Sequence, residues 1–194
     1  MHQGEADNIG DITLLALGGN VPTRAGPPAQ TLQAALGALE EVFGPLSVSH
    51  LYQTPAFPEG AGPDFVNAAC TLKTGLAAPE ILAQLHRIEA DFDRTRAVRW
   101  GQRTLDLDLI ACGGQILPDR TTYDHWRGLA LEEQMVRPPD QLILPHPRLQ
   151  DRAFVLVPLA DVAPDWRHPV LGQTVRQMRD ACSASDLASV RRLS

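Results

Sequence analysis

Residues 12–20 read Ile-Thr-Leu-Leu-Ala-Leu-Gly-Gly-Asn, and the fold can be worked out from this stretch. An apolar run that ends in two glycines and an asparagine is typical of a buried strand that enters a tight turn. The run from 12 to 17 has six residues, which are too few to cross a bilayer. The stretch therefore predicts a strand inside a globular domain, and we expect no membrane partner.

The segments that follow alternate between strand and helix patterns. Apolar residues recur at helical spacing in two segments, and runs rich in β-forming residues lie around them. Helices are predicted at 32–43 and 79–92, strands at 46–52, 65–74 and 105–112, and loops at 54–64 and 93–102. With the first strand, the order is β-α-β-β-α-β, which predicts an α+β protein with a ferredoxin-like core. A helix or strand at 152–159 and weak helical spacing at 170–182 predict C-terminal helical additions.

Length, charge and cysteine content limit the class of protein. The 194 residues predict one domain, placed at 12–183 with an excursion at 115–141, between a flexible extension (1–11) and a flexible tail (184–194). A net charge of −6 argues against a general nucleic-acid-binding protein. The three cysteines form no Cys-x-x-Cys pair, and the N-terminus lacks a signal-peptide core. We therefore expect a cytoplasmic protein without a nucleic-acid partner.

Two carboxylates alternate with leucines in Leu105-Asp106-Leu107-Asp108-Leu109. In a strand, this alternation places Asp106 and Asp108 on one face and the leucines on the other. Neighbouring carboxylates repel each other unless a cation lies between them, and hard oxygen ligands of this kind suit Mg²⁺, with room for two ions. On the alternation alone, a solvent-facing strand with two acidic residues is the simpler interpretation.

An arginine-rich loop directly before these carboxylates changes that interpretation. Arg94, Arg96, Arg99 and Arg103 have no acidic residue among them. Metal ions beside guanidinium groups are what a polyphosphate substrate requires, although any single arginine here could be a surface charge. The chain's one lysine, Lys73, does not follow a glycine-rich run, so a Walker-type phosphate loop is not expected. The pattern therefore predicts that arginine and bound metal recognise phosphate.

Four stretches, taken in order, resemble the 6-hydroxymethyl-7,8-dihydropterin pyrophosphokinase family. The most specific is Arg-Trp-Gly-Gln-Arg-Thr-Leu-Asp-Leu-Asp at 99–108. The others are Ala-Leu-Gly-Gly-Asn at 16–20, Leu-Tyr-Gln-Thr-Pro at 51–55 running on to Pro-Asp-Phe-Val-Asn-Ala-Ala at 63–69, and Pro-His-Pro-Arg-Leu at 145–149 with Arg152 and Phe154. Together they span roughly residues 12–165.

The resemblance implies a reaction and a set of site residues. A diphosphate would move from MgATP to the 6-hydroxymethyl group of the dihydropterin, with release of AMP. Asp106 and Asp108 would hold two Mg²⁺ ions, and Arg94 and Arg103 would steady the transferring phosphate. The implied ATP contacts are Glu89, Arg96, Trp100, Leu109, His146 and Arg152, and the implied pterin contacts are Gly18, Asn20, Thr54, Pro55, Phe57, Phe65, Asn67 and Phe154. Phe65 and Phe154 would stack on the pterin ring, and we expect a monomer.

The chain departs from the family pattern at several positions. Gly19 replaces a serine, Gln53 an arginine and Phe65 a tyrosine, and the arginine loop is shorter. The excursion at 115–141 is longer than the family pattern, which leaves a surface insertion, a cover for the ATP side and an oligomer contact as alternatives. A non-catalytic pterin- or nucleotide-binding relative is the alternative function. All four residues assigned to metal and phosphate are present, which favours the enzyme.

Overall fold

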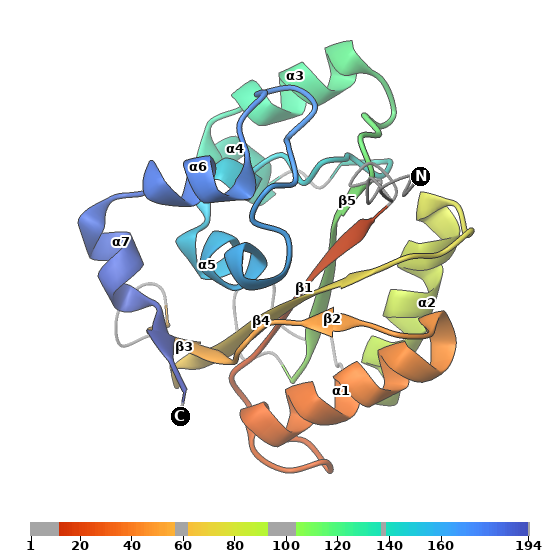
Figure 1. Ribbon diagram of the computed structural model, residues 1–194, viewed down its shortest axis with the longest axis vertical. Helices are drawn as coiled ribbons and strands as arrows, with labels where there is room; N and C mark the ends of the chain where they lie inside the picture. Colours follow the sequence, from red (N-terminus) through yellow and green to blue (C-terminus); the bar gives the residue numbers. More distant parts are fainter. Residues whose placement is uncertain (1–11, 57–61, 93–103, 137–138, 194) are drawn as a thin grey trace, which may run out of the picture.

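The computed structural model describes residues 12–56, 62–92, 104–136 and 139–193. In them, a six-stranded antiparallel sheet packs against helices on both faces (Figure 1). The strands are β1 (Thr13–Gly19), β2 (Ser47–Val48), β3 (Tyr52–Thr54), β4 (Phe65–Leu72), β5 (Asp106–Cys112) and β6 (Arg191–Arg192). The helices are α1 (Pro28–Phe43), α2 (Ala78–Asp91), α3 (Arg120–Gly128), α4 (Leu131–Val136), α5 (Ala153–Val162), α6 (Val175–Asp180) and α7 (Ala184–Ser189).

Strand β1 lies inside the sheet, whose order is β5-β1-β4-β3-β6 with β2 beside β4. It pairs with β4 on one side and with β5 on the other. Leu14 and Leu15 point to opposite faces and both are fully buried, as expected for a strand covered on both sides. The buried strand predicted at 12–17 is therefore confirmed, and it continues through Gly18 and Gly19 before the chain turns.

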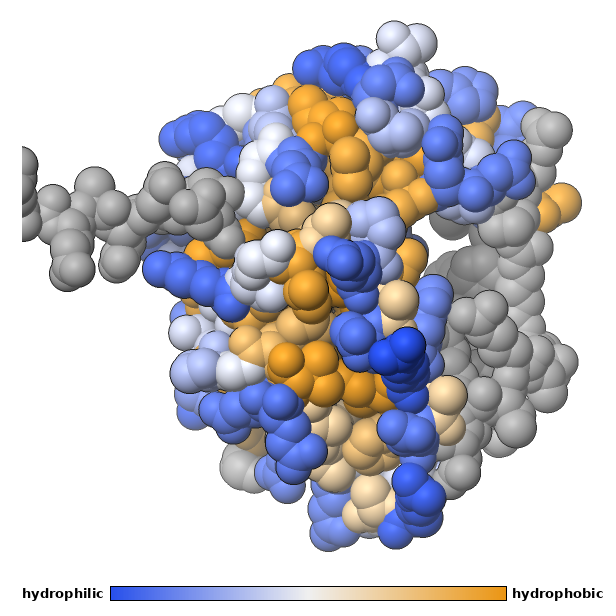
Figure 2. Space-filling model, turned by 90° about the vertical axis from the view of Figure 1, so that its right-hand side faces the viewer, coloured by the Kyte–Doolittle hydropathy of each residue, from blue (hydrophilic) through white to orange (hydrophobic). Residues whose placement is uncertain are grey.

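Two hydrophobic cores lie on the two faces of the sheet. One lies under α1 and α2 and includes Leu15, Leu17 and Leu107. The other lies under α5 and α6 and includes Ala16 and Ile110. Burying a leucine or isoleucine side chain completely stabilises the fold by about 1.5–3 kcal/mol, so these two cores fix the face to which every side chain of β1 and β5 points. Figure 2 shows the α2 side of the molecule, where apolar residues gather in the middle and hydrophilic residues border them.

The strand predicted at 46–52 is two short strands, β2 and β3. Ser49 interrupts the ladder between them: its N–H donates to the Ala69 carbonyl, and its hydroxyl oxygen accepts from the Ala69 N–H, both at 2.9 Å. The side chain thus replaces a backbone acceptor and shifts the chain. Thr54, which was predicted to lie in a loop, is the last residue of β3.

The C-terminal segment differs from its prediction as a flexible tail (184–194). Residues 184–193 contain α7 and β6. Ser183 begins α7 by accepting a hydrogen bond from the Asp186 N–H at 3.1 Å, and β6 pairs with β3. The pairing satisfies the backbone groups at this edge of the sheet, which would otherwise be open. The β6 strand consists of two consecutive arginines, which give no strand pattern, so the sequence did not predict this strand.

The excursion at 115–141 contains α3 and α4, and it packs against the C-terminal part of the same chain. Tyr123 of α3 is fully buried, with its hydroxyl 3.0 Å from Nε2 of the buried His168. Trp166, two residues before His168, donates from its indole nitrogen to the Gly113 carbonyl at 3.0 Å. These contacts join α3, and the turn that precedes the excursion, to the segment that contains Trp166 and His168. In the described part of the chain, we find no helix with the length and apolar character of a membrane span.

Candidate functional site

The site is built on one row of residues that crosses three strands. Asn67 of β4 pairs with Gly18 of β1, which pairs on its other side with Asp106 of β5. Directly opposed residues in an antiparallel sheet point their side chains to the same face. Asp108 lies opposite Ala16, which belongs to the core under α5. The amide and both carboxylates therefore lie on the α5 face, as the alternation predicted for the carboxylates.

Gly18 keeps the middle of this row open. A Cβ atom at Gly18 would lie 3.2 Å from Asn67 Oδ1, which is closer than an ordinary van der Waals contact of about 3.5–4.0 Å. A glycine inside a strand commonly marks a place where a ligand or another chain comes close to the backbone. The row can therefore accommodate a ligand between an amide on one side and a carboxylate on the other.

Asn67 is held in one orientation by Thr54. The amide Nδ2 donates to the Thr54 hydroxyl oxygen at 2.8 Å, and both side chains are buried. This bond directs Oδ1 of Asn67 toward Gly18. Thr54 pairs with Phe65 across the strands, and Phe65 is half-buried on the same face. An amide, a hydroxyl group and an aromatic ring on one surface suit a flat ligand with a polar edge.

The carboxylates lie beside the N-terminal end of α5. Asp106 and Asp108 are half-buried, and Arg152 Nη1 is 3.8 Å from Asp108 Oδ2. The Arg152 guanidinium also lies 5.8 Å from the centre of the Phe154 ring. In the part of the chain that is described, no group of three or more metal-ligating side chains occurs. A pair of carboxylates alone is the donor set that suits Mg²⁺ carrying substrate phosphates, because this ion is commonly held by one or two carboxylates.

His146 has its proton on one defined ring nitrogen. Its Nδ1 accepts a hydrogen bond from the Arg148 N–H at 3.1 Å, so in the neutral ring the proton is on Nε2. Desolvation, with a smaller contribution from the Arg152 charge, lowers the pKa of His146 well below its usual value. The imidazole is therefore a neutral donor at pH 7. Its backbone N–H donates to the Ile110 carbonyl at 2.7 Å, which joins the turn to β5.

Glu89 and Leu109, two of the predicted ATP contacts, lie on the α2 side of β5, away from the face that carries Asp106 and Asp108. Glu89 is 1% exposed, and its Oε1 accepts from the Leu107 N–H at 2.8 Å, so it stabilises the β5 edge between the two aspartates. Leu109 is buried in the core under α1 and α2, on the face opposite Asp108. The Leu109 side chain fills this core, so the ATP contact of Leu109 stays a prediction, and it would be made by the backbone of Leu109.

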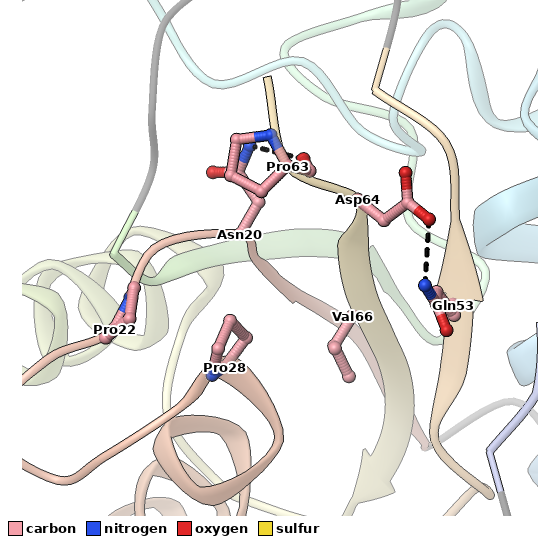
Figure 3. Close-up of a pocket in the computed structure, with 7 residues that line it drawn as sticks. All are labelled: Asn20, Pro22, Pro28, Gln53, Pro63, Asp64 and Val66. Carbon is pink, nitrogen blue, oxygen red and sulfur yellow. Dashed lines mark hydrogen bonds between the residues drawn. The ribbon is translucent and has the colours of Figure 1, made fainter. Parts of the chain in front are cut away.

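Asn20 lies just beyond the row, where it joins two segments. Its Nδ2 donates to the Pro63 carbonyl at 3.1 Å (Figure 3), and the side chain is buried. Pro55 follows β3 and is exposed, and Phe154 on α5 is 40% exposed. Phe57, Arg94, Arg96, Trp100 and Arg103, which were also predicted as site residues, lie outside the described residues.

No sequence pattern predicted the role of Asp161, which joins α5 to the sheet. Its Oδ2 accepts from the Tyr52 hydroxyl at 2.9 Å, and it lies 2.9 Å from Nδ1 of His50. Because α5 also begins next to Arg152 and Phe154, this contact helps to hold the helix that carries part of the site. More than 100 positions separate Asp161 from either partner, and no motif signals such a contact.

Comparisons with known proteins point to one family of enzymes. The family described as 7,8-dihydro-6-hydroxymethylpterin-pyrophosphokinase matches residues 14–164. A Synechocystis protein named 2-amino-4-hydroxy-6-hydroxymethyldihydropteridine pyrophosphokinase is 40% identical over 168 residues, which cover 85% of this chain and 73% of that protein. A Pseudomonas aeruginosa protein of the same name is 37% identical, over 87% of this chain and 90% of its own length.

Solved structures share the fold. A crystal structure of wild-type Plasmodium falciparum HPPK-DHPS matches with a TM-score of 0.60 at 17% identity. The match covers 88% of this chain and 44% of that one, so this chain spans less than half of the longer protein. At this level of identity, the likeness concerns the mixed helix and sheet architecture alone.

Proposed function

Because this chain belongs to the 7,8-dihydro-6-hydroxymethylpterin-pyrophosphokinase family, it is an enzyme of folate synthesis, and we propose that its reaction takes place on the row from Asn67 to Asp106. The reaction transfers diphosphate from ATP to the 6-hydroxymethyl group of 6-hydroxymethyl-7,8-dihydropterin and releases AMP. The observation that carries the placement is the register, which puts Gly18 between an oriented amide and a carboxylate.

Asn67, Thr54 and Phe65 form the proposed pterin surface. Oδ1 of Asn67 can accept from the N–H groups at the polar edge of a pterin, while the Phe65 ring offers a stacking face. Gly18 leaves room for the ring close to the backbone of β1. Phe154, exposed on α5, would cover the other face of the pterin, and Pro55, Phe57 and Asn20 would lie around its rim.

Asp106 and Asp108 are the residues that would hold Mg²⁺. The two half-buried carboxylates point to one face. Asp108 is loosely paired with Arg152 at 3.8 Å, so a cation of higher charge can replace that contact. When bound, the ions would neutralise charge on the phosphates of ATP. His146, as a neutral Nε2–H donor, and Arg152 would bind phosphate oxygens, and Glu89 would keep the β5 edge in place.

The arginine-rich loop completes the proposal from sequence. Arg94 and Arg103 would stabilise charge on the transferring group, and Arg96 and Trp100 would contact ATP. Displacement at phosphorus depends on alignment and on charge stabilisation more than on covalent chemistry. Guanidinium groups suit this role, because each can donate two parallel hydrogen bonds to phosphate.

Three broader properties are also proposals. The strand order β5-β1-β4-β3, with antiparallel neighbours, supports a ferredoxin-like arrangement of the core. Three free cysteines favour a reducing cytoplasm. We propose a monomer that acts on two small molecules, and the net charge of −6 argues against a nucleic-acid partner.

Replacing Asp108 with Asn tests the proposed metal site. We expect Asp108→Asn to lower kcat by about 100-fold or more, the order found when one strong electrostatic contact to a transition state is lost. The affinity for pterin should change little, because Asp108 lies beyond the pterin surface. Asp165→Asn, at an exposed position far along the chain, is the matched control. Near-normal turnover of Asp108→Asn would contradict the assignment.

A further inference from the structure

A pocket lies on the other face of the strand ends that form the proposed pterin surface. In β4, Val66 lies between Phe65 and Asn67, and in β3, Gln53 lies between Tyr52 and Thr54. Successive strand residues point to opposite faces, so Val66 and Gln53 point toward the α1 side, and Val66 packs against the core under α1. A molecule against Val66 and Gln53 would therefore lie on the opposite face of the sheet from Phe65 and Thr54, with Asn20, which also lines the pocket, at the border with the proposed pterin rim.

The pocket has a rigid apolar wall. Its volume is about 500 Å³, and its lining includes Pro22, Pro28, Pro63 and Val66. Small-molecule sites commonly have volumes of roughly 300–1,000 Å³ and are mostly apolar. Proline rings have a fixed backbone angle and little side-chain freedom, so this wall requires little ordering when a ligand binds. Figure 3 shows Pro22 and Pro28 across from Gln53 and Asp64, with Val66 between the two sides.

The opposite wall carries a negative charge beside a neutral partner. Nε2 of Gln53 donates to Asp64 Oδ2 at 2.8 Å, and an amide leaves the charge of the carboxylate in place. Among the described residues, no ion pair involves Asp64. Because Nε2 of Gln53 is directed to Asp64, its Oε1 remains a second acceptor on this wall. The polar wall thus offers acceptors and favours a cation.

We propose that this pocket binds a small organic ammonium ion carried on an apolar ring. The ring would lie against the prolines and Val66, and the ammonium group would donate to Asp64 and to Oε1 of Gln53. An anionic ligand would be repelled by the Asp64 carboxylate, and a purely polar ligand would leave the proline wall without an apolar contact. The pocket shares Asn20 with the proposed pterin rim, but the residues that would hold the ring and the ammonium group have no role in the proposed pterin or metal site.

NMR spectroscopy of the full chain, with ¹³C-labelled valine methyl groups, tests the proposal with benzylamine, which is protonated at pH 7. We expect saturable shifts of the Val66 methyl signals and intermolecular NOEs from the benzyl ring to Val66 and Pro28. Benzyl alcohol, which has the same ring without the charge, should bind more weakly.

Asp64→Asn should weaken benzylamine binding by about two- to fivefold, as expected for loss of an exposed charge pair. Asp165→Asn, another exposed carboxylate, should leave the affinity unchanged. Because Asp64 is exposed, we expect the Asp64→Asn variant to fold, and the NMR spectrum of the variant shows directly whether it is folded. The proposal is overturned by an absence of saturable shifts at Val66, by missing NOEs, or by equal affinity of Asp64→Asn and the parent chain.

Discussion

Replacing Gly18 with Ala places one methyl group in the middle of the candidate site. The added Cβ would lie 3.2 Å from Oδ1 of Asn67 and 3.9 Å from the Val66 carbonyl oxygen. Asn67 would have to move by a few tenths of an ångström, and its 2.8 Å bond to Thr54 resists that movement. Weakening this bond costs about 0.5–1.5 kcal/mol, while replacing a strand glycine with alanine returns about 0.5–1 kcal/mol. The free energy of unfolding should therefore change by less than about 1 kcal/mol.

Activity should respond much more strongly than stability. The methyl group occupies the space between Asn67 and Asp106 and displaces the amide that orients the pterin. A ring bound close to the β1 backbone would be pushed outward by about 1 Å by the methyl group itself, and a misplacement of this size can cost 100-fold in rate, so kcat/KM of Gly18→Ala should fall by about 100-fold. Product formation and urea unfolding measure the two effects. Gly37→Ala, which adds a methyl group with nothing within 4 Å, is the control. Turnover of Gly18→Ala within twofold of the parent chain would refute the placement of the site on this row.

Three further predictions concern stability and titration. Gly37→Ala in α1 should raise the free energy of unfolding by about 0.5–1 kcal/mol through helix propensity, and urea unfolding measures it. Burial, with a smaller effect of the Arg127 charge, lowers the pKa of His168 from 6.5 to about 4. As the pH falls from 6.5 to 4, the unfolded chain binds a proton at His168 before the folded chain does, so the free energy of unfolding falls by about 3 kcal/mol. His168→Asn should flatten this pH dependence in unfolding curves measured between pH 4 and 6.5. An unchanged slope would contradict the burial of a neutral His168. Burial, followed by the hydrogen bond to Asp161, raises the pKa of Tyr52 to about 12. Asp161→Asn should therefore lower the pKa of one of the two tyrosines of the chain, measured by absorbance titration at 295 nm. If neither tyrosine pKa shifts, the contact between Tyr52 and Asp161 is contradicted.

The sequence alone predicted those strands, helices and side-chain directions that depend on local periodicity. The first strand, the helices α1 and α2 on one face of the sheet, and the alternation of Asp106 and Asp108 follow from the spacing of apolar residues. That alternation also placed Leu109 with Leu105 and Leu107, away from the carboxylates. The structure agrees with this pattern, because the Leu109 side chain lies in the core on the opposite face from Asp108.

Contacts between distant segments could not be predicted. The pairing of Gly18 with Asn67 joins positions 49 residues apart, and it depends on strand register, which single-sequence patterns do not determine. The β6 strand has no apolar alternation, because its pairing with β3 uses backbone groups alone. The hydrogen bond between Tyr123 and His168 forms only when α3 packs against the C-terminal segment.

The most direct test of the account is product analysis of the whole protein. Incubation with ATP, Mg²⁺ and 6-hydroxymethyl-7,8-dihydropterin, followed by mass spectrometry, should give AMP and the pterin diphosphate in equal amounts. EDTA should abolish both products, because the two aspartates would then lack their ions. Release of ADP instead of AMP, or pterin binding without any product, would contradict the diphosphate transfer on which the account rests.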